Sequence, residues 1–225
     1  MTELQRFFWL ATAFLVCLPA VAANDWRLLE NGLEIPDENY ADQPYVVITD
    51  DGHWLCTLTT GAGHEGKRGQ HVVATISKDH GQTWSSIIPI EPDNGPEASW
   101  VVPLKTDFGR VYAFYTYNGD NVDVGRNDTH GWYAGKYSDD GGYTWSDERL
   151  RLPMRITACD ADNGLPEGTI HFWGICKPIV VDGVVYFTFT KLSKHFLQDG
   201  EGWLFRSDNI LTERDPSKIH WEMLP

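Results

Sequence analysis

The chain has few basic residues, few cysteines and only one long hydrophobic run. Its 225 residues include 18 Lys and Arg against 32 Asp and Glu, which gives a formal net charge of −14. Proteins bind nucleic acids and anionic membranes through clustered basic residues, so this charge argues against both as partners. Hydrophobic residues make up 42% of the chain, and tryptophan occurs 10 times. This composition predicts a globular protein with enough apolar side chains for one large β domain.

The hydrophobic run covers residues 7–18, after Arg6 and before Pro19 and Ala20-Val21-Ala22. A single cation, a short apolar stretch and a small-x-small site are typical of a secretory signal peptide. The run is shorter than the roughly 20 apolar residues of a membrane-spanning helix. We therefore expect a signal peptide over residues 1–23 and a lead-in over 24–39. The protein is predicted to be secreted, extracellular or periplasmic, with no membrane attachment after cleavage.

Three cysteines remain after that cleavage: Cys56, Cys159 and Cys176. An odd number allows at most one internal disulfide. Cys56 lies in an apolar run and is expected to be a buried thiol. Cys159 and Cys176 are the candidate pair, and the sequence leaves open whether they are bridged. No ligand spacing indicates zinc or haem, so neither a metal nor a cofactor is predicted.

An eight-residue motif, Ser-x-Asp-x-Gly-x-Thr-Trp, occurs twice with a displacement of 61 residues. A third copy begins at Ser207 and closes at Trp221 after an insertion. Asp and Gly favour a tight turn, and a following Trp is suited to anchor it by packing. We expect these motif residues to be structural: Ser77, Asp79, Gly81, Trp84, Ser138, Asp140, Gly142 and Trp145.

Around each copy, runs of β-branched and aromatic residues bounded by turn residues predict four strands. Repeats of this period are typical of stacked or radially arranged units. The sequence thus predicts an all-β fold, a β-propeller with blades at about 40–90, 97–152 and 172–225. Propellers usually close with about four to eight blades. Residues 40–225 are therefore interpreted as the N-terminal half of a propeller, with an obligate assembly of such pieces as the alternative.

The two intact motifs resemble the Asp boxes, or bacterial neuraminidase (BNR) repeats, of the sialidase (neuraminidase) superfamily. The resemblance covers residues 40–225 and implies a six-bladed propeller that acts as an exo-acting glycoside hydrolase on a glycan. It also implies that the Asp boxes lie on the face away from the active site. The active site is then expected where first strands begin and where second strands turn into third strands.

Sialidases carry Arg-Ile-Pro at the start of the first blade, where the arginine grips the carboxylate of sialic acid. Asp42-Gln43-Pro44 stands at the matching place here. A carboxylate at this position would repel that substrate, which argues for a related glycosidase rather than one specific for sialic acid. The Tyr–Glu nucleophile pair of the family would lie beyond residue 225.

Cleavage of a glycosidic bond needs a proton donor and a nucleophile or base, usually two carboxyl groups. The candidate catalytic residues on the implied face are Asp42, Glu65, Glu97 and Asp120. The candidate substrate-binding residues are Gln43, His64, His71, Trp100, Trp173 and Lys177. For each of them, turn chemistry, a solvated loop or core packing is the structural alternative.

Three functions remain open on the sequence. The first is a secreted sialidase-like glycoside hydrolase, which the number of carboxylates on one face favours. The second is a non-catalytic carbohydrate-binding propeller. The third is a propeller polysaccharide lyase, for which Lys177 and His64 offer a cation and a base.

Overall fold

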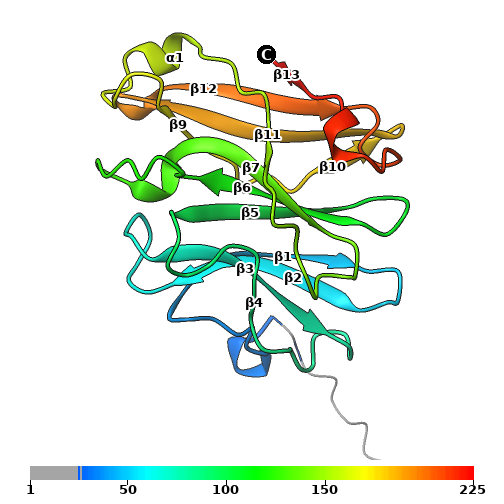
Figure 1. Ribbon diagram of the computed structural model, residues 1–225. Helices are drawn as coiled ribbons and strands as arrows, with labels where there is room; N and C mark the ends of the chain where they lie inside the picture. Colours follow the sequence, from blue (N-terminus) through cyan, green and yellow to red (C-terminus); the bar gives the residue numbers. More distant parts are fainter. Residues whose placement is uncertain (1–24, 26) are drawn as a thin grey trace, which may run out of the picture. The chain divides into compact units, whose positions relative to one another are not determined.

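The computed structural model describes Asp25 and residues 27–225, whose contacts divide the chain into two compact units. In the described part of the first unit, which ends at Leu33, Leu29–Asn31 form a 3-10 helix. The second unit, Glu34–Pro225, consists mainly of antiparallel strands (Figure 1). The all-β fold class is thereby confirmed. The predicted signal peptide, residues 1–23, lies outside the described residues.

The first sheet has four antiparallel strands in chain order (Figure 1). They are β1 (Tyr40–Ile48), β2 (Trp54–Gly61), β3 (Gln70–Ser77) and β4 (Ile88–Pro89). Every residue of β3 is buried. Alternate residues of β3 enter different hydrophobic clusters, Val72 and Ala74 in one and Val73 in another. Both faces of this strand are therefore covered, which explains its nearly continuous apolar sequence.

Nine further strands are joined by hydrogen bonds into one continuous sheet. The first four are β5 (Ala98–Lys105), β6 (Val111–Tyr117), β7 (His130–Ser138) and β8 (Leu150–Arg151). The other five are β9 (Ile170–Trp173), β10 (Ile179–Val181), β11 (Val184–Ser193), β12 (Phe196–Ser207) and β13 (Glu222–Leu224). β9 connects the two groups, because His171 pairs with His130 of β7 and Trp173 pairs with Thr190 of β11.

The helices of this unit are short. The α-helix α1 covers Ala158–Ala161, and Thr157 and Asp160 form a capping box at its start. Two 3-10 helices cover Asn127–Thr129 and Pro216–Lys218. Among the described residues, no helix has the length and apolar character needed to cross a membrane.

Both intact copies of the repeat motif fold into the same hydrogen-bonded turn. The Ser77 hydroxyl donates to Asp79 Oδ1 at 2.8 Å, and Asp79 accepts from the backbone N–H and the hydroxyl of Thr83 at 2.8 and 2.6 Å. The same three bonds of the second copy, made by Ser138, Asp140 and Thr144, measure 2.7, 2.9 and 2.6 Å. Hydrogen bonds from Thr83, and then from Ser77, lower the pKa of Asp79 to about 2, because they stabilise its charged form. The motif carboxylates are thus engaged within their own turns.

The third copy closes through the same contact despite its insertion. Asn209 stands where the other copies have Asp, and its Oδ1 accepts from the backbone N–H of His220 at 2.9 Å. His220 precedes Trp221 as Thr83 precedes Trp84. The inserted residues include the 3-10 helix Pro216–Lys218. An amide therefore replaces the carboxylate in a longer version of the same turn.

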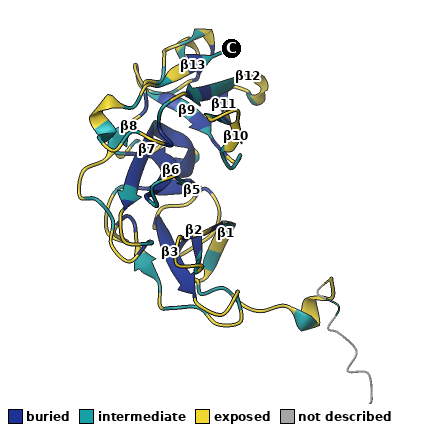
Figure 2. Ribbon diagram, turned by 90° about the vertical axis from the view of Figure 1, so that its right-hand side faces the viewer, coloured by how far each residue is buried: buried dark blue, intermediate teal, exposed yellow. Residues whose placement is uncertain are grey.

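Each motif tryptophan packs against a different hydrophobic cluster. Trp84 packs within the first sheet, and Trp145 packs where that sheet meets β5–β7. Trp221 joins an aromatic cluster, with ring centroids 5.5 Å from Phe114 and 5.7 Å from Phe187. The buried central strands of each sheet are dark blue in Figure 2. The tryptophans therefore help to fix successive groups of strands to one another, as large buried aromatic side chains do.

Several details differ from the sequence-based expectations. The strand β9 was not predicted, because it is four residues long and pairs through only two residues on each side. The polar, glycine-rich segment 192–202 is expected from the sequence to be the loop between the second and third strands of the third blade, but most of it is the β11–β12 hairpin, which pairs Lys191 with Glu201 and Thr190 with Gly202. The outer strands β4, β8 and β10 are only two or three residues long.

The candidate disulfide between Cys159 and Cys176 is not formed. Cys56, Cys159 and Cys176 are all free thiols. Cys159 Sγ contacts the Asp199 carbonyl oxygen at 3.5 Å, whereas Cys176 Sγ contacts the Lys177 carbonyl oxygen at 3.4 Å. The two thiols therefore have separate backbone partners. Cys56 is completely buried, and burial raises the pKa of its thiol to about 12.

Candidate functional site

Two first strands carry the same distortion at the end where the site was expected. β1 has a bulge between Asp42 and Tyr45, and β5 has one between Ser99 and Val102. Gln43 and Trp100 lie within these bulges and have φ angles of 51° and 63°, respectively. This left-handed backbone conformation is uncommon for residues other than glycine. Bulges and strained backbone are frequent next to functional sites because they re-aim side chains.

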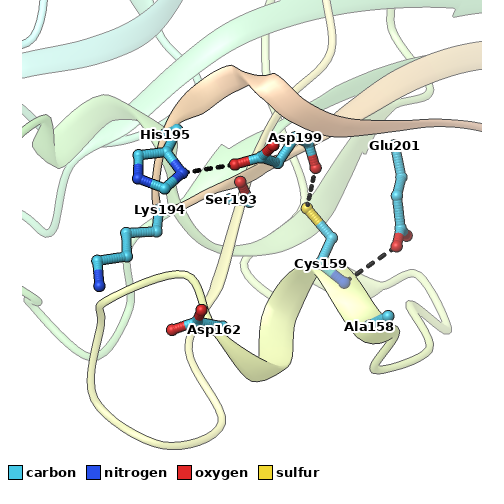
Figure 3. Close-up of a pocket in the computed structure, with 8 residues that line it drawn as sticks. All are labelled: Ala158, Cys159, Asp162, Ser193, Lys194, His195, Asp199 and Glu201. Atoms are coloured by element: carbon cyan, nitrogen blue, oxygen red, sulfur yellow. Dashed lines mark hydrogen bonds and ion pairs between the residues drawn. The ribbon is translucent and has the colours of Figure 1, made fainter.

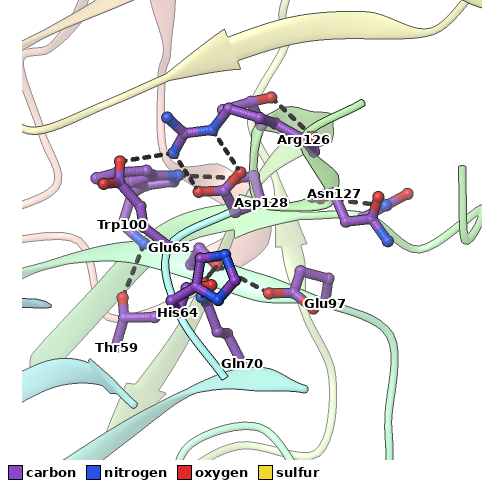
Figure 4. A network of polar contacts seen from close by, with 12 residues as sticks. Thr59, His64, Glu65, Gln70, Glu97, Trp100, Arg126, Asn127 and Asp128 are labelled. Atoms are coloured by element: carbon purple, nitrogen blue, oxygen red, sulfur yellow. Dashed lines mark hydrogen bonds and ion pairs between the residues drawn. The ribbon is translucent and has the colours of Figure 1, made fainter. Parts of the chain in front are cut away.

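Two loops meet beside these bulges through Arg126 (Figure 4). Arg126 lies in the β6–β7 loop, and its guanidinium donates to Glu65 of the β2–β3 loop at 2.7 Å and to Asp128 at 2.6 Å. The side chains are 31%, 50% and 0% exposed, respectively. Gly66 has φ of 78°, and a Cβ there would lie 3.2 Å from Arg126 Nε. The glycine at position 66 therefore allows the β2–β3 loop to approach Arg126 closely.

Three aromatic rings surround the same guanidinium. The Arg126 Cζ atom lies 5.6 Å from the Trp100 ring centroid, 5.7 Å from that of Trp173 and 5.9 Å from that of Phe196. These distances are within the range of cation–π attraction. We call Arg126 with Glu65, Asp128, Trp100, Trp173 and Phe196 the Arg126 cluster. Its members come from five different segments of the chain.

The aromatic residues of the Arg126 cluster differ in exposure. Trp100 is 6% exposed, and its Nε1 donates to the Asp128 carbonyl oxygen at 2.8 Å, so it supports the loop. Trp173 and Phe196 are partly exposed and lie 5.2 Å apart in an edge-on arrangement. These two rings are the ones that offer surface to a ligand.

Asp42 and Tyr40 of β1 lie near these carboxylates. Burial is the main reason that the pKa of Asp42 is raised; hydrogen bonds from Tyr40 and Gln43 oppose the shift, and the charges of Glu65 and Asp128 add to it. The pKa of Tyr40 is also raised, chiefly by burial and then by Asp42 and Glu65. The environment thus makes the Asp42 carboxyl easier to protonate than an isolated aspartate, while Glu65 is paired with Arg126.

Glu97 occupies a separate small cavity of about 60 Å³ lined by Asn118, Asn121 and Asn127 among others. It is 7% exposed and accepts a hydrogen bond from the Gly69 backbone N–H at 3.2 Å. Burial raises its pKa to about 7, and the charge of Asp128 adds to the shift, whereas backbone hydrogen bonds from Gln70 and Gly69 oppose it. Glu97 is therefore a buried acid next to the Arg126 cluster rather than a member of it.

The remaining predicted residues do not join the Arg126 cluster. His71 lies between the Glu91 carbonyl oxygen at 2.8 Å and Glu38 at 2.7 Å, which occupy both ring nitrogens. Lys177 donates to the Val46 carbonyl oxygen at 2.6 Å. His64 and Asp120 are exposed, and Asp120 has no hydrogen bond or ion pair with any residue that the structure describes. Gln43 lies at the bulge, with its Oε1 buried and unpartnered among those residues.

Arg126, Asp128, Phe196 and Tyr40 were missed by the sequence interpretation. Arg126 had one usable signal, because it follows Glu65 by 61 residues, which is also the displacement of the repeat motif. The two residues therefore occupy corresponding places in successive repeats. Asp128 and Phe196 have no comparable signal.

A cavity of about 300 Å³ lies beside the β11–β12 turn (Figure 3). Its lining is acidic, with Asp162, Asp199 and Glu201, and Asp199 pairs with His195 at 2.6 Å. Glu201 accepts from the Cys159 backbone N–H at 3.0 Å. Among residues 25 and 27–225, no set of three or more His, Cys, Asp or Glu side chains is arranged to hold a metal ion.

Comparison with known proteins identifies the fold. No protein-family description matches the sequence, and no curated protein is significantly similar. The structure is similar to a Hadza microbial sialidase, Hz136, with a TM-score of 0.57 and 17% identity over 83% of this chain. It is also similar to a protein of unknown function from Dyadobacter fermentans, with a TM-score of 0.58 and 14% identity over 83% of this chain. A thermostable family-43 glycoside hydrolase is similar with a TM-score of 0.57 and 13% identity over 81% of this chain. The chain spans 37%, 55% and 53% of those three proteins, respectively.

Proposed function

We propose that this chain forms three blades of a six-bladed, sialidase-like propeller and that the Arg126 cluster is part of a glycoside hydrolase site. The fold shared with a sialidase and a family-43 glycoside hydrolase supports the architecture. The register supports the location: Asp42 and Gln70 lie at one end of the first sheet, and the motif residue Ser77 lies at the other. The proposal extends to export through the N-terminal signal segment.

The observation that carries this proposal is the meeting of Glu65 with partly exposed Trp173 and Phe196 around one arginine, with Asp42 close enough for the charge of Glu65 to raise its pKa. Sugar rings stack on aromatic side chains, and glycoside cleavage uses two carboxyl groups in different protonation states. Asp42 is the proton donor to the glycosidic oxygen as the bond to the anomeric carbon breaks. Glu65 accepts the proton of the attacking water. Arg126 holds the Glu65 carboxylate in place through their ion pair.

The reaction class is tested by incubating the protein with a panel of neutral, uronic and sialylated glycans. Release of reducing sugar without an unsaturated product supports hydrolysis. Release of an unsaturated uronate, detected by its ultraviolet absorbance, would show that the protein is a polysaccharide lyase instead of a hydrolase. Binding without either product would replace it with a carbohydrate-binding propeller, and neither binding nor product on any glycan would overturn it.

A further inference from the structure

A third cavity, of about 430 Å³, adjoins the Arg126 cluster and shares Arg126 and Phe196 with it. The β6–β7 loop, the segment before β9 and the β11–β12 turn form its walls, with His130, Asn163, His171 and Lys194 in the lining. None of its lining residues is Asp or Glu. Four other cavities of the described residues each contain at least one acidic side chain. An acid-free cavity is unusual in a chain with a net charge of −14.

Two residues that line this cavity carry buried polar atoms without a hydrogen-bond partner among the described residues. Both ring nitrogens of His171 and the hydroxyl of Ser193 are shielded from solvent and lack a hydrogen-bond partner among the described residues. Burial is the main cause that lowers the pKa of His171 to about 4; the ring is therefore neutral near pH 7, with one N–H to donate. An unpaired buried polar group destabilises the folded protein, and a bound hydrogen-bonding group would offset that cost.

The free positive charge of the cavity is Lys194. Arg126 is already paired with Glu65 and Asp128. Lys194 forms no ion pair with any residue in the described part of the chain. Figure 3 shows its side chain on the opposite side of the neighbouring acidic cavity from Glu201. Lys194 therefore keeps a charge that a ligand can use.

We propose that this cavity, next to the Arg126 cluster, binds an oxyanion substituent of a sugar, either a carboxylate or a sulfate ester. Lys194 supplies the charge, and His171 and Ser193 supply hydrogen bonds. Phe196 lies between the two places, with its centroid 5.8 Å from that of His171 and 5.2 Å from that of Trp173. Resting on the proposed function, the inference makes the substrate an acidic glycan whose charged sugar lies beside the one that is cleaved.

The test is affinity electrophoresis through gels that contain polygalacturonate, its methyl ester, κ-carrageenan or desulfated carrageenan. Each pair differs only in the charged group, so the two pairs separate carboxylate from sulfate. We expect one charged polysaccharide to retard the protein more than its uncharged form, although bulk repulsion between polyanions works against this. Lys194→Gln should weaken that retention about three- to tenfold, the range for the net contribution of a typical hydrogen bond. Lys78→Gln, an equal change of charge at an exposed motif position, should leave it unchanged.

Equal or weaker retention by both charged members would overturn the inference, as would equal effects of the two lysine substitutions. The assay reads binding without turnover, so its outcome is separable from that of the proposed hydrolysis. Charge-dependent retention without cleavage would retain the subsite and reject the hydrolase. Cleavage without charge-dependent retention would do the reverse.

Discussion

Arg126 is the centre of the Arg126 cluster, because one guanidinium contacts two carboxylates and three aromatic rings. Asp128, which is fully buried, depends on it for charge compensation. Glu65 depends on it for position, since half of the Glu65 side chain is exposed to water. The sequence predicted Glu65, Trp100 and Trp173 on this face but not the residue that brings them together.

The buried carboxyl of Glu97 predicts a specific pH dependence of stability. Its pKa in the folded protein is about 7, against an ordinary value of 4.5, so the folded state holds this proton more tightly than the unfolded state. The stability that this tighter proton binding contributes is fully present below about pH 4.5 and is lost as pH rises through about 7. Between pH 5 and pH 8, the free energy of unfolding of Glu97→Gln should therefore fall less than that of the wild type, by on the order of 2 kcal/mol. Urea unfolding of both proteins at the two pH values measures this difference.

The exposed Asp120 supplies the control for that measurement. Asp120→Asn removes one carboxylate without altering a described contact, so it should leave the pH dependence as it is. If Glu97→Gln and the wild type lose the same stability between pH 5 and pH 8, then Glu97 is an ordinary, ionised carboxylate.

At the scale of the elements, the helix α1 depends on one buried ion pair. Lys191 of β11 is 0% exposed and donates to Asp160 of α1 and to the Arg155 carbonyl oxygen. Lys191→Met would leave the Asp160 carboxylate buried and unpaired, which typically costs about 3–5 kcal/mol. Adding Asp160→Asn should recover a large part of that loss, because the amide is neutral. Denaturant unfolding of the two single variants and the double variant provides the cycle, and strictly additive losses would show that the pair is not coupled.

The repeat turns predict a contrast between two glycine substitutions. Gly142 has φ of 100°, and a Cβ there would lie 2.4 Å from Leu55 Cδ1 in the core. Gly183 has φ of 78°, with no atom within 4 Å of such a Cβ. Gly183→Ala should cost about 1–2 kcal/mol of backbone strain, and Gly142→Ala should cost about 1–3 kcal/mol more through overpacking. Equal losses in thermal unfolding would contradict the close packing of this turn.

Local pattern was sufficient to predict most strands and the motif turns. Alternation, β-branched runs and turn residues are short-range signals, and they predict strands over 53–59, 71–77, 110–117 and 184–191, close to the observed β2, β3, β6 and β11. The β11–β12 hairpin was mistaken for a loop because Asp199-Gly200-Glu201-Gly202 has loop composition while its backbone pairs with β11. β9 depends on partners from two other strands and has no local signature.

At the scale of the whole molecule, the 61-residue repeat relates two charged loop residues as well as two motif turns. Glu65 and Arg126 lie 61 residues apart and come from corresponding loops of successive repeats, yet they have opposite charges and form an ion pair. The resemblance to sialidases implies a site at the end of the strands from which the β2–β3 and β6–β7 loops emerge, and Glu65 and Arg126 of those loops meet there. The sequence could not predict which loop residues meet, because those contacts depend on loop conformations set by glycines such as Gly66.

The acidic residues of the chain fall into groups with different roles. Some carboxylates, such as Asp79, are engaged in motif turns, and others line the acidic cavity beside the β11–β12 turn. Asp42 and Glu65 are the pair to which the account assigns chemistry. The net charge of −14 therefore gave no direct indication of the site, whereas the acid-free cavity beside it stands out against that charge.

The most direct test of the proposed hydrolase site uses the glycan that the wild-type protein cleaves in the panel. It compares how fast three variants turn over that glycan. Asp42→Asn and Glu65→Gln remove the proposed acid and base, and Asp120→Asn removes an exposed carboxylate on a neighbouring loop. The account predicts that kcat falls about 10²- to 10⁴-fold in the first two, the usual contribution of general acid–base catalysis, and stays within about twofold in the third, since surface changes away from a site have little effect. Turnover retained by Asp42→Asn and Glu65→Gln, in folded protein, would contradict it.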